Sequence, residues 1–295
     1  MSANDTNQTD PPWLDRDEYP FTHRYLDVGP GEMHYVDEGE GRPLLMLHGN
    51  PTWSFLYRHL IDGLSDDYRC IAPDYLGFGL SDKPVGWSYR PADHAETIAT
   101  LIDTLELEDF TLIANDWGGP IGLDYATRQP AVLHSLVLLN TFMWPTEDVK
   151  ARLFSAALGN RLTRVLIRRY NLFATRVMPM LFGEDAAMSQ EIHRHYIAHL
   201  ATPSDREGSW VFPREITRSE SWLSDLWERR SALTDRPMLL VWGTADPGLG
   251  SALGRWRETF PDAAVKEYPA VGHYVQEELG PELVGPVRDF LADHS

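Results

Sequence analysis

The sequence predicts an α/β fold built on a mostly parallel sheet. Five short apolar runs end in polar residues or glycine, and they alternate with segments of helical length. Because these runs are continuously apolar rather than alternating, they are typical of strands that are buried on both faces of a parallel sheet. The chain has 295 residues, of which 43% are hydrophobic, so it can form one large core with or without an insertion.

The expected strands are the five apolar runs at 43–49, 68–74, 110–116, 134–141 and 237–246. The expected helices lie at about 53–64, 91–106, 118–129 and 250–259. This alternation predicts right-handed crossover connections. Upstream, "FTHRYLDV" and "GEMHYVDEG" alternate apolar and polar residues around Gly-Pro-Gly, which predicts an antiparallel hairpin at the edge of the sheet.

The pattern changes between residues 142 and 232. Strand-like runs stop there, and Leu, Met, Arg and aromatic residues recur at helical spacing. We therefore expect a polar N-terminal segment (1–20), a core made of 21–141 and 233–295, and a helical cap (142–232). An insertion at this point would lie over the carboxyl ends of the strands, where open α/β sheets bind ligands.

The charge and the cysteine content limit the cell compartments and the binding partners that we expect. The 26 basic and 44 acidic residues give a net charge of −18, so we expect no binding to nucleic acid or to membranes. Cys70 is the single cysteine, so no intrachain disulfide can form. The N-terminus lacks an apolar signal region, and no apolar run approaches the roughly 18 residues of a membrane span, which favours a cytoplasmic location.

The basic residues are nearly all arginine, because lysine occurs only at Lys83, Lys150 and Lys266. An ordinary acidic enzyme can have this composition. A protein adapted to a high-salt cytosol can have it too, because salt screens the mutual repulsion of carboxylates. The sequence leaves both interpretations open.

The stretch "LIANDWGGPIG" (112–122) predicts a strand, a sharp turn and a helix, with Asp116 at the bend. Ala114 and Gly118 lie two positions before and after it, and both are small, as the nucleophile elbow of α/β-hydrolases requires. The alternative is an aspartate that merely caps the next helix. A carboxylate is already ionised near neutrality and can attack an sp³ carbon to form an ester. Asp116 therefore predicts displacement at carbon rather than acyl transfer.

A base and an orienting acid are expected at the ends of later strands. His273 lies in "YPAVGHYVQEE" after the expected last strand, and Asp246 ends "VWGTAD". The order Asp116, Asp246, His273 is that of nucleophile, acid and base in hydrolases with this elbow. Asn140 ends the preceding strand but cannot carry the charge that steadies an imidazolium, so Asp246 is favoured. The alternative for His273 is a surface histidine.

The remaining histidines predict no second chemical site. In "EIHRHYIAH", His195 and His199 have the i, i+4 spacing of a metal-binding pair, with His193 nearby. Because no glutamate that could act as a base lies between them, we interpret them as a solvated helix face and expect no metal. We interpret His48 as a structural loop residue.

The loop "HGNPTWSFLYR" (48–58) supplies candidates for anion binding. The backbone N–H groups of Asn50 and Trp117 are candidates for an oxyanion hole. The Asn50 amide and the Trp117 indole are uncharged donors. Two such donors in an apolar pocket would suit chloride or bromide, whereas a hydroxyl leaving group would need a proton donor.

Four motifs together closely resemble the haloalkane dehalogenases: "HGNPTWSFLYR", "APDYLGFGLSDKP", "NDWGG" and "GHYVQEE". "WVFPREI" inside the insertion resembles a cap motif of that family, and the matching blocks span about residues 31–290. Asn140 together with Asp246 resembles the branch of the family that has an Asp-Asp-His triad and an Asn/Trp halide pair. The motif "DWGG" alone is less specific, because epoxide hydrolases share it.

The resemblance implies an α/β-hydrolase fold and release of halide from small halogenated alkanes by water, with no cofactor and no metal. Asp116 would displace the halide, and Asn50 and Trp117 would hold it. His273, oriented by Asp246, would activate water against the ester and release a primary alcohol. Some relatives with these motifs self-associate, so a homo-oligomer is one of the states left open. The expected cap wall consists of Trp144, Phe154, Phe173, Met178, Leu181, Phe182 and Phe212.

Two other classes remain open from the sequence. An epoxide hydrolase would keep the same triad and use cap tyrosines, Tyr170 and Tyr196, to protonate the epoxide oxygen. Asn50 argues against it, because that position usually lacks a side-chain donor in epoxide hydrolases. A ligand-binding receptor or an oxygenase-like luciferase on the same scaffold is the third interpretation, and an intact triad disfavours pure binding.

Overall fold

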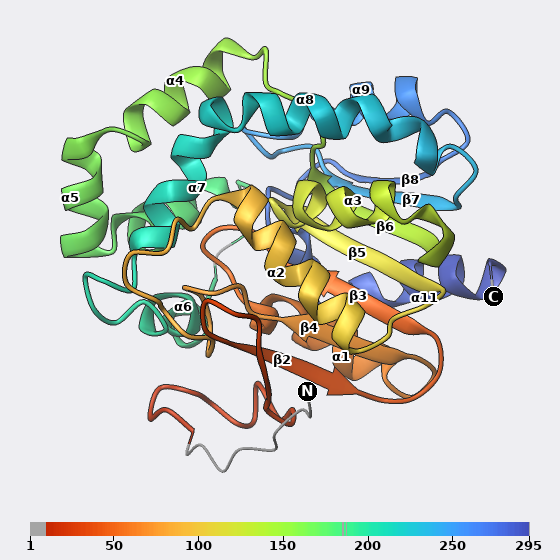
Figure 1. Ribbon diagram of the computed structural model, residues 1–295, viewed down its shortest axis with the longest axis horizontal. Helices are drawn as coiled ribbons and strands as arrows, with labels where there is room; N and C mark the ends of the chain where they lie inside the picture. The colour runs from red at the N-terminus through yellow and green to blue at the C-terminus, as the bar shows by residue number, and fades with distance from the viewer. Residues whose placement is uncertain (1–9, 185, 187, 295) are drawn as a thin grey trace.

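The computed structural model describes residues 10–184, 186 and 188–294, and within these eight strands form one sheet (Figure 1). The strands are β1 (Arg24–Asp27), β2 (Glu32–Glu38), β3 (Pro43–Leu47), β4 (Arg69–Pro73), β5 (Phe110–Asp116), β6 (Leu133–Thr141), β7 (Met238–Gly243) and β8 (Ala264–Tyr268). Their order is β1-β2-β4-β3-β5-β6-β7-β8. β2 pairs antiparallel with β1 and β4, and all other pairs are parallel. The expected mostly parallel α/β sheet is confirmed.

The five apolar runs form β3 to β7, and the upstream hairpin forms β1 and β2 at one edge. β8 at the opposite edge was not expected. Its residues, "AVKEY", are exposed or only partly buried, because no further strand covers them. An edge strand of this kind needs no continuous apolar run, and so it leaves no such signal in the sequence.

Helices cover both faces of the sheet (Figure 1). α2 and α3 pack together on one face, and α1 and α11 pack together on the other. The helices of the core are α1 (Arg58–Leu64), α2 (Pro91–Thr104), α3 (Gly118–Arg128), α9 (Ala252–Thr259), α10 (Val275–Leu279) and α11 (Val284–Asp293). None of the helices in the described ranges is long and apolar enough to cross a membrane.

Between β6 and β7 the chain is helical. The helices are α4 (Val149–Leu158), α5 (Arg161–Tyr170), α6 (Gln190–Ala198), α7 (Glu207–Arg218) and α8 (Glu220–Glu228). The side chains of Asp148, Asn160 and Ser189 cap the first turns of α4, α5 and α6 by accepting backbone N–H bonds. α7 packs against both α4 and α5, and α8 contacts α3, so this segment rests on the core.

Part of the N-terminal segment packs into the core. Leu14 and Tyr19 are buried, and the Trp13 ring lies edge-on to Trp53 with centroids 5.7 Å apart. Residues 1–9 of the expected polar segment lie outside the described residues.

The expectation of a solvated helix face in α6 is wrong for His195 and His199, which are both buried. The N-terminal segment covers His195, and Nε2 of His195 accepts a hydrogen bond from the Asp15 backbone N–H at 3.1 Å. His199 Nδ1 accepts from the Gly79 N–H at 2.9 Å. Among the described residues no cluster of metal-ligating side chains forms around them.

Candidate active site

Five residues from separate strand ends meet in one cavity of about 450 Å³. Asn50 follows β3, Asp116 ends β5, Trp117 follows it, Asp246 follows β7, and His273 follows β8. The carboxyl ends of parallel strands lie at one edge of a sheet, and therefore residues far apart in the sequence converge there.

The β5–α3 turn holds Asp116 in a left-handed conformation with φ of 51°. The turn is so tight that a Cβ at Gly118 would lie 2.0 Å from the carbonyl oxygen of Leu47, and one at Gly119 would lie 1.9 Å from Thr141 Oγ1. Thr141 Oγ1 donates to the Asp116 carbonyl at 2.5 Å. Thr141 was not expected from the sequence, although polar residues at strand ends are a general signal.

The Asp116 carboxylate turns toward backbone donors. Its Oδ2 accepts from the Asn50 N–H at 3.0 Å, and the Trp117 N–H also bonds to the carboxylate. No side chain caps α3, so the capping interpretation of Asp116 is not supported. Burial raises the pKa of Asp116 above its ordinary value. The charge of His273 and the two N–H bonds oppose this shift but do not outweigh it.

His273 and Asp246 form a buried pair, with 2.8 Å between His273 Nδ1 and Asp246 Oδ2. Burial by itself lowers the pKa of His273, but the charge and hydrogen bond of Asp246 outweigh it and raise that pKa to about 9. Burial would raise the pKa of Asp246, but His273 and the further bonds to this carboxylate hold it below its ordinary value. The pair therefore favours an imidazolium beside a carboxylate.

Asn140 holds the Asp246 carboxylate in place. Its Nδ2 donates to Asp246 Oδ2 at 2.9 Å and to the Gly243 carbonyl at 2.8 Å, while its Oδ1 accepts from the Gly243 N–H at 2.8 Å. The Gly248 N–H donates to Asp246 Oδ1 at 2.7 Å. In the sequence, Asn140 was an unsuitable acid and, with Asp246, a mark of the family branch, but its contact with Asp246 was not predicted.

The cap contacts the loop that carries His273. The His273 N–H donates to the Leu181 carbonyl at 2.8 Å. The Glu278 carboxylate accepts from Gly272 N and from Gly183 N, both at 2.9 Å. One half-buried carboxylate thus joins the His273 loop to the cap, and no role for Glu278 was predicted from the sequence.

The Asn50 and Trp117 side chains are free to bind a ligand. Within the described part of the chain, no residue accepts a hydrogen bond from the Trp117 indole, and Asn50 Oδ1 is buried without a partner. Phe142 and Phe212 hold the indole ring, with centroids 5.0 Å and 5.7 Å away. An amide and an indole edge that both lack internal partners can bind an anion at this wall of the cavity.

Comparisons with known proteins show the family to which the chain belongs. Residues 42–278 match the model of the alpha/beta hydrolase fold family. Haloalkane dehalogenase 2 of Mycobacterium tuberculosis is 38% identical over 272 residues, which cover 91% of this chain and 94% of that protein. The chain belongs to the haloalkane dehalogenase family.

Two further proteins are similar to this chain. The crystal structure of haloalkane dehalogenase DbeA from Bradyrhizobium elkani matches with a TM-score of 0.81 at 26% identity, covering 92% of this chain and 99% of that one. A cis-3-alkyl-4-alkyloxetan-2-one decarboxylase of Shewanella oneidensis is 33% identical over 285 residues, covering 93% of this chain and 89% of that protein. The family resemblance therefore includes proteins named for two different reactions.

The wall of the cavity differs in part from the expected dehalogenase cap wall. Trp144, Phe154, Phe173 and Leu181 line the cavity. Met178, Phe182 and Phe212 are not among its lining residues, so these three expectations are wrong. The reason is that they pack inward: Met178 is fully buried, Phe182 packs on Tyr274 at 5.4 Å, and Phe212 packs behind Trp117 on Phe78 at 5.5 Å. Helical spacing does not separate core residues from cavity residues.

Lining residues that were not expected include Phe142, Pro213, Ile216, Leu223 and Leu249.

The two cap tyrosines do not line the cavity. Tyr170 is 61% exposed on the outer side of α5. The Tyr196 hydroxyl is buried and donates to Glu277 Oε2 at 2.5 Å, and Glu277 also pairs with Arg58 at 2.7 Å. Neither hydroxyl is placed to protonate a ligand beside Asp116.

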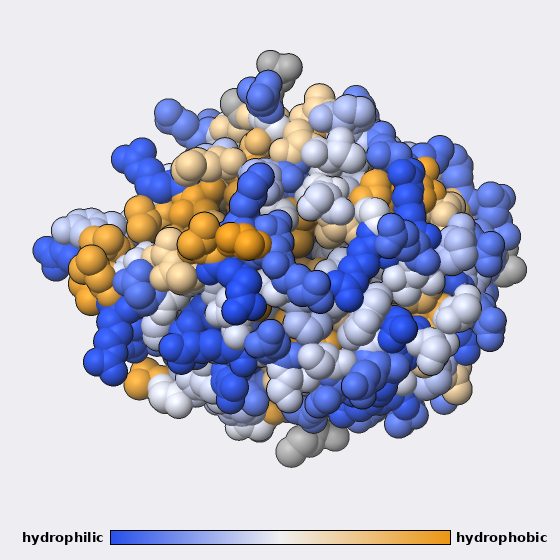
Figure 2. All heavy atoms as spheres, turned by 90° about the horizontal axis from the view of Figure 1, so that it is seen from above, coloured by the Kyte–Doolittle hydropathy of each residue, from blue (hydrophilic) through white to orange (hydrophobic). Residues whose placement is uncertain are grey.

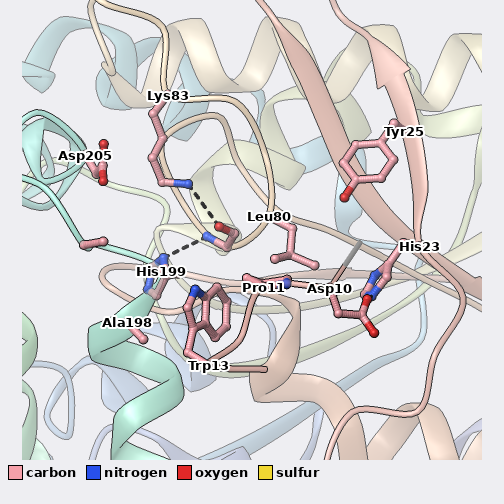
Figure 3. Close-up of a pocket in the computed structure, with 12 residues that line it drawn as sticks. Asp10, Pro11, Trp13, His23, Tyr25, Leu80, Lys83, Ala198, His199 and Asp205 are labelled. Atoms are coloured by element: carbon pink, nitrogen blue, oxygen red, sulfur yellow. Dashed lines mark hydrogen bonds and ion pairs between the residues drawn. The ribbon is translucent and has the colours of Figure 1, made fainter. Parts of the chain in front are cut away.

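A second cavity of about 290 Å³, lined by none of Asp116, Asp246 and His273, lies beside the N-terminal segment (Figure 3). Lys83 and His199 approach it from opposite walls, and both bond to the backbone of Gly79. Trp13, His23 and Asp10 are among its other lining residues. Burial lowers the pKa of Lys83 and that of His199, the latter to about 3. This cavity contains no elbow nucleophile.

Proposed function

We propose that this protein hydrolyses haloalkanes to primary alcohol and halide through an alkyl ester on Asp116. The observation that carries the proposal is a carboxylate at an elbow that faces an apolar cavity together with two unpaired, uncharged N–H donors. The roles below belong to this proposal, with Asp116, Asp246 and His273 as the triad and Asn50 and Trp117 as the halide pair.

In the first step, Asp116 Oδ attacks the carbon that bears the halogen, and the C–halogen bond breaks with its electron pair on the halide. The Asn50 amide and the Trp117 indole bind the departing ion. Since both donors are neutral, they stabilise a diffuse monoanion without holding it as tightly as a cation would. Release of the halide then remains feasible.

In the second step, water activated by His273 attacks the ester carbonyl. The backbone N–H groups of Asn50 and Trp117 already bond to the Asp116 carboxylate, so they can stabilise the oxyanion that forms there. The charge of Asp116 also raises the pKa of His273. Esterification removes that charge, so the pKa of His273 falls in the intermediate and the imidazole becomes available as a base when it is needed.

We also propose the division of labour between core and cap. The core segments 21–141 and 233–295 would carry the triad, and the cap (142–232) would supply the apolar wall. The support is that Trp144, Phe154, Phe173 and Leu181 approach the cavity from the cap side while the five site residues lie at strand ends.

A second candidate follows from the decarboxylase relatives. An oxetan-2-one ring offers Asp116 an sp³ carbon whose leaving group is a carboxylate. Cleavage of the resulting Asp116–carbon bond with loss of CO₂ would form an alkene and restore the enzyme. An epoxide hydrolase has less support, because neither Tyr170 nor Tyr196 lines the cavity.

The test is a substrate panel under conditions that keep the protein folded, including molar salt. Bromide release is measured with 1,2-dibromoethane and 1-bromobutane, gas release with a cis-3,4-dialkyloxetan-2-one, and diol formation with styrene oxide. We expect bromide release that Asp116→Ala abolishes. Turnover of the lactone or the epoxide without bromide from any haloalkane would overturn the proposal in favour of the corresponding activity.

A further inference from the structure

The cap has a charge opposite to that of the molecule. Residues 149–170, which form α4, α5 and their connection, contain six of the 26 basic residues and none of the 44 acidic ones. The remaining chain has all 44 acidic residues against 20 basic ones. Net charge predicts repulsion from anionic surfaces, but the local charge of this segment favours attraction. The six basic residues are Lys150, Arg152, Arg161, Arg164, Arg168 and Arg169.

The same segment exposes apolar side chains. We call it the α4–α5 face, and its apolar members are Val149, Leu153, Leu162, Val165, Leu166 and Tyr170, of which Leu162 is 71% exposed. In α5 they recur at i, i+3, i+4 and i+8, so they form one stripe along the helix. Figure 2 shows orange side chains gathered at this end of the molecule with blue ones between them.

Part of the positive charge of this face has no carboxylate partner among the residues that the structure describes. Arg164 pairs with Glu207 at 2.8 Å, Arg168 lies 3.6 Å from the same carboxylate, and Arg152 lies 3.9 Å from Glu220. Among the described residues, Lys150, Arg161 and Arg169 have no carboxylate within ion-pair distance. Three cations without a carboxylate partner therefore flank an exposed apolar stripe, and one of them, Arg169, lies over the ring of Tyr170.

We propose that the α4–α5 face docks on the surface of an anionic lipid bilayer. A basic helix with an exposed apolar stripe has the chemistry of an interfacial helix, with cations at the headgroups and apolar side chains below them. The docking would be parallel to the surface, because no described helix can span a bilayer.

A second copy of the chain fits this face less well. A two-fold contact would place the same unpaired cations against each other. A contact with the acidic surface of another copy would satisfy the charges but not the apolar stripe. Outside this face, only Val85 and Met180 are strongly exposed large hydrophobic residues in the part of the chain that the structure describes.

The face adjoins the mouth of the active-site cavity. Lys150, Ala151 and Phe154 of α4 line that cavity, so docking would place its entrance close to the lipid. If the proposed dehalogenation holds, an alkyl substrate dissolved in the bilayer could enter without crossing water. The docking itself does not depend on that activity.

The test is sedimentation of the full chain with sucrose-loaded vesicles, at the lowest salt at which circular dichroism shows it folded. Vesicles of phosphatidylcholine alone are compared with vesicles that also contain phosphatidylglycerol. We expect binding only to the anionic vesicles, weakening as salt is raised. Arg161→Glu with Arg169→Gln should reduce the partition coefficient on the order of tenfold or more, and Leu162→Ser with Val165→Ser should reduce it as well.

Two control variants match these changes elsewhere on the surface. Val85→Ser removes an apolar side chain that is 95% exposed, and Lys266→Glu reverses an exposed charge on β8. Both should bind as the unmodified protein does. Equal binding to both vesicle types, no binding, or unchanged binding of the face variants would overturn the proposal. A dimer in ultracentrifugation that Leu162→Ser dissociates, without vesicle binding, would instead assign the face to a second copy.

Discussion

At the scale of single residues, His273 illustrates how charge and burial compete. Burial disfavours its charged form, and Asp246 and Asp116 favour it strongly enough to raise its pKa to about 9. The sequence predicted the pairing of His273 with Asp246 from chain order alone. It could not predict the Asn140 contact with Asp246, because that contact depends on how β6 and β7 align.

The raised pKa of His273 makes stability depend on pH. A group whose pKa is higher in the folded state than its ordinary 6.5 stabilises the fold fully below that value. This contribution is lost as pH rises through about 9. We expect the free energy of unfolding, measured with urea, to fall over this range.

The matched variant for the pH dependence is His273→Phe. It removes the titrating group, while Asp246 keeps its bonds to Asn140 and Gly248. The decline above neutral pH should be smaller in this variant. An identical decline in both proteins would show that other groups are responsible.

The proposed halide donors predict the effect of Trp117→Phe. The change removes the indole N–H and keeps an aromatic ring against Phe142 and Phe212. Loss of one hydrogen bond to an anion costs about 1.5–3 kcal/mol, so kcat/KM for 1-bromobutane should fall by roughly tenfold to a hundredfold. The rate of bromide release at several substrate concentrations measures kcat/KM.

Trp144→Phe is the control, because Trp144 lines the same cavity but packs on Trp227 and Arg255. Its effect on kcat/KM should be several times smaller. Equal losses in the two variants would contradict a specific role for the Trp117 indole.

At the scale of elements, sequence patterns predicted the buried strands and the elbow but not the edge strand β8. A strand buried on both faces must be apolar along its length, so β3 to β7 were recognisable. β8 is exposed and was missed. In α6, helical spacing could not reveal that residues more than a hundred positions earlier cover His195, where the Phe55 ring stacks at 4.4 Å. Faces of a helix are assigned by tertiary contacts that spacing does not encode.

The tightness of the elbow predicts a contrast between two glycines. A Cβ at Gly118 would lie 2.0 Å from a backbone carbonyl, whereas one at Gly254 in α9 would meet nothing within 4 Å. Gly118→Ala should destabilise the fold by about 3 kcal/mol or more and abolish activity. Gly254→Ala should stabilise it by about 0.5–1 kcal/mol.

Urea unfolding of both glycine variants checks this contrast. If Gly118→Ala retained normal stability and activity, the strand–turn–helix geometry around Asp116 would be wrong.

At the scale of the whole molecule, the net charge of −18 and its uneven distribution set the expected response to salt. The net charge follows from the composition, but only the fold shows that the basic residues of α4 and α5 lie beside exposed apolar side chains. Repulsion among the carboxylates destabilises the compact state, and salt screens it.

The melting temperature should therefore rise with sodium chloride concentration, and the protein should unfold below molar salt if it is adapted to a high-salt cytosol. Differential scanning fluorimetry across salt concentrations measures both effects. A melting temperature that does not depend on salt would rule out the high-salt interpretation.

The most direct test of the account is the mass of His273→Phe after incubation with 1-bromobutane. Without the base, the ester on Asp116 should form with release of one bromide and then persist. Intact-protein mass spectrometry should show the gain of one butyl group in place of a proton, localised to the peptide that contains Asp116. Bromide release without that adduct, or an adduct on another residue, would contradict covalent catalysis by Asp116.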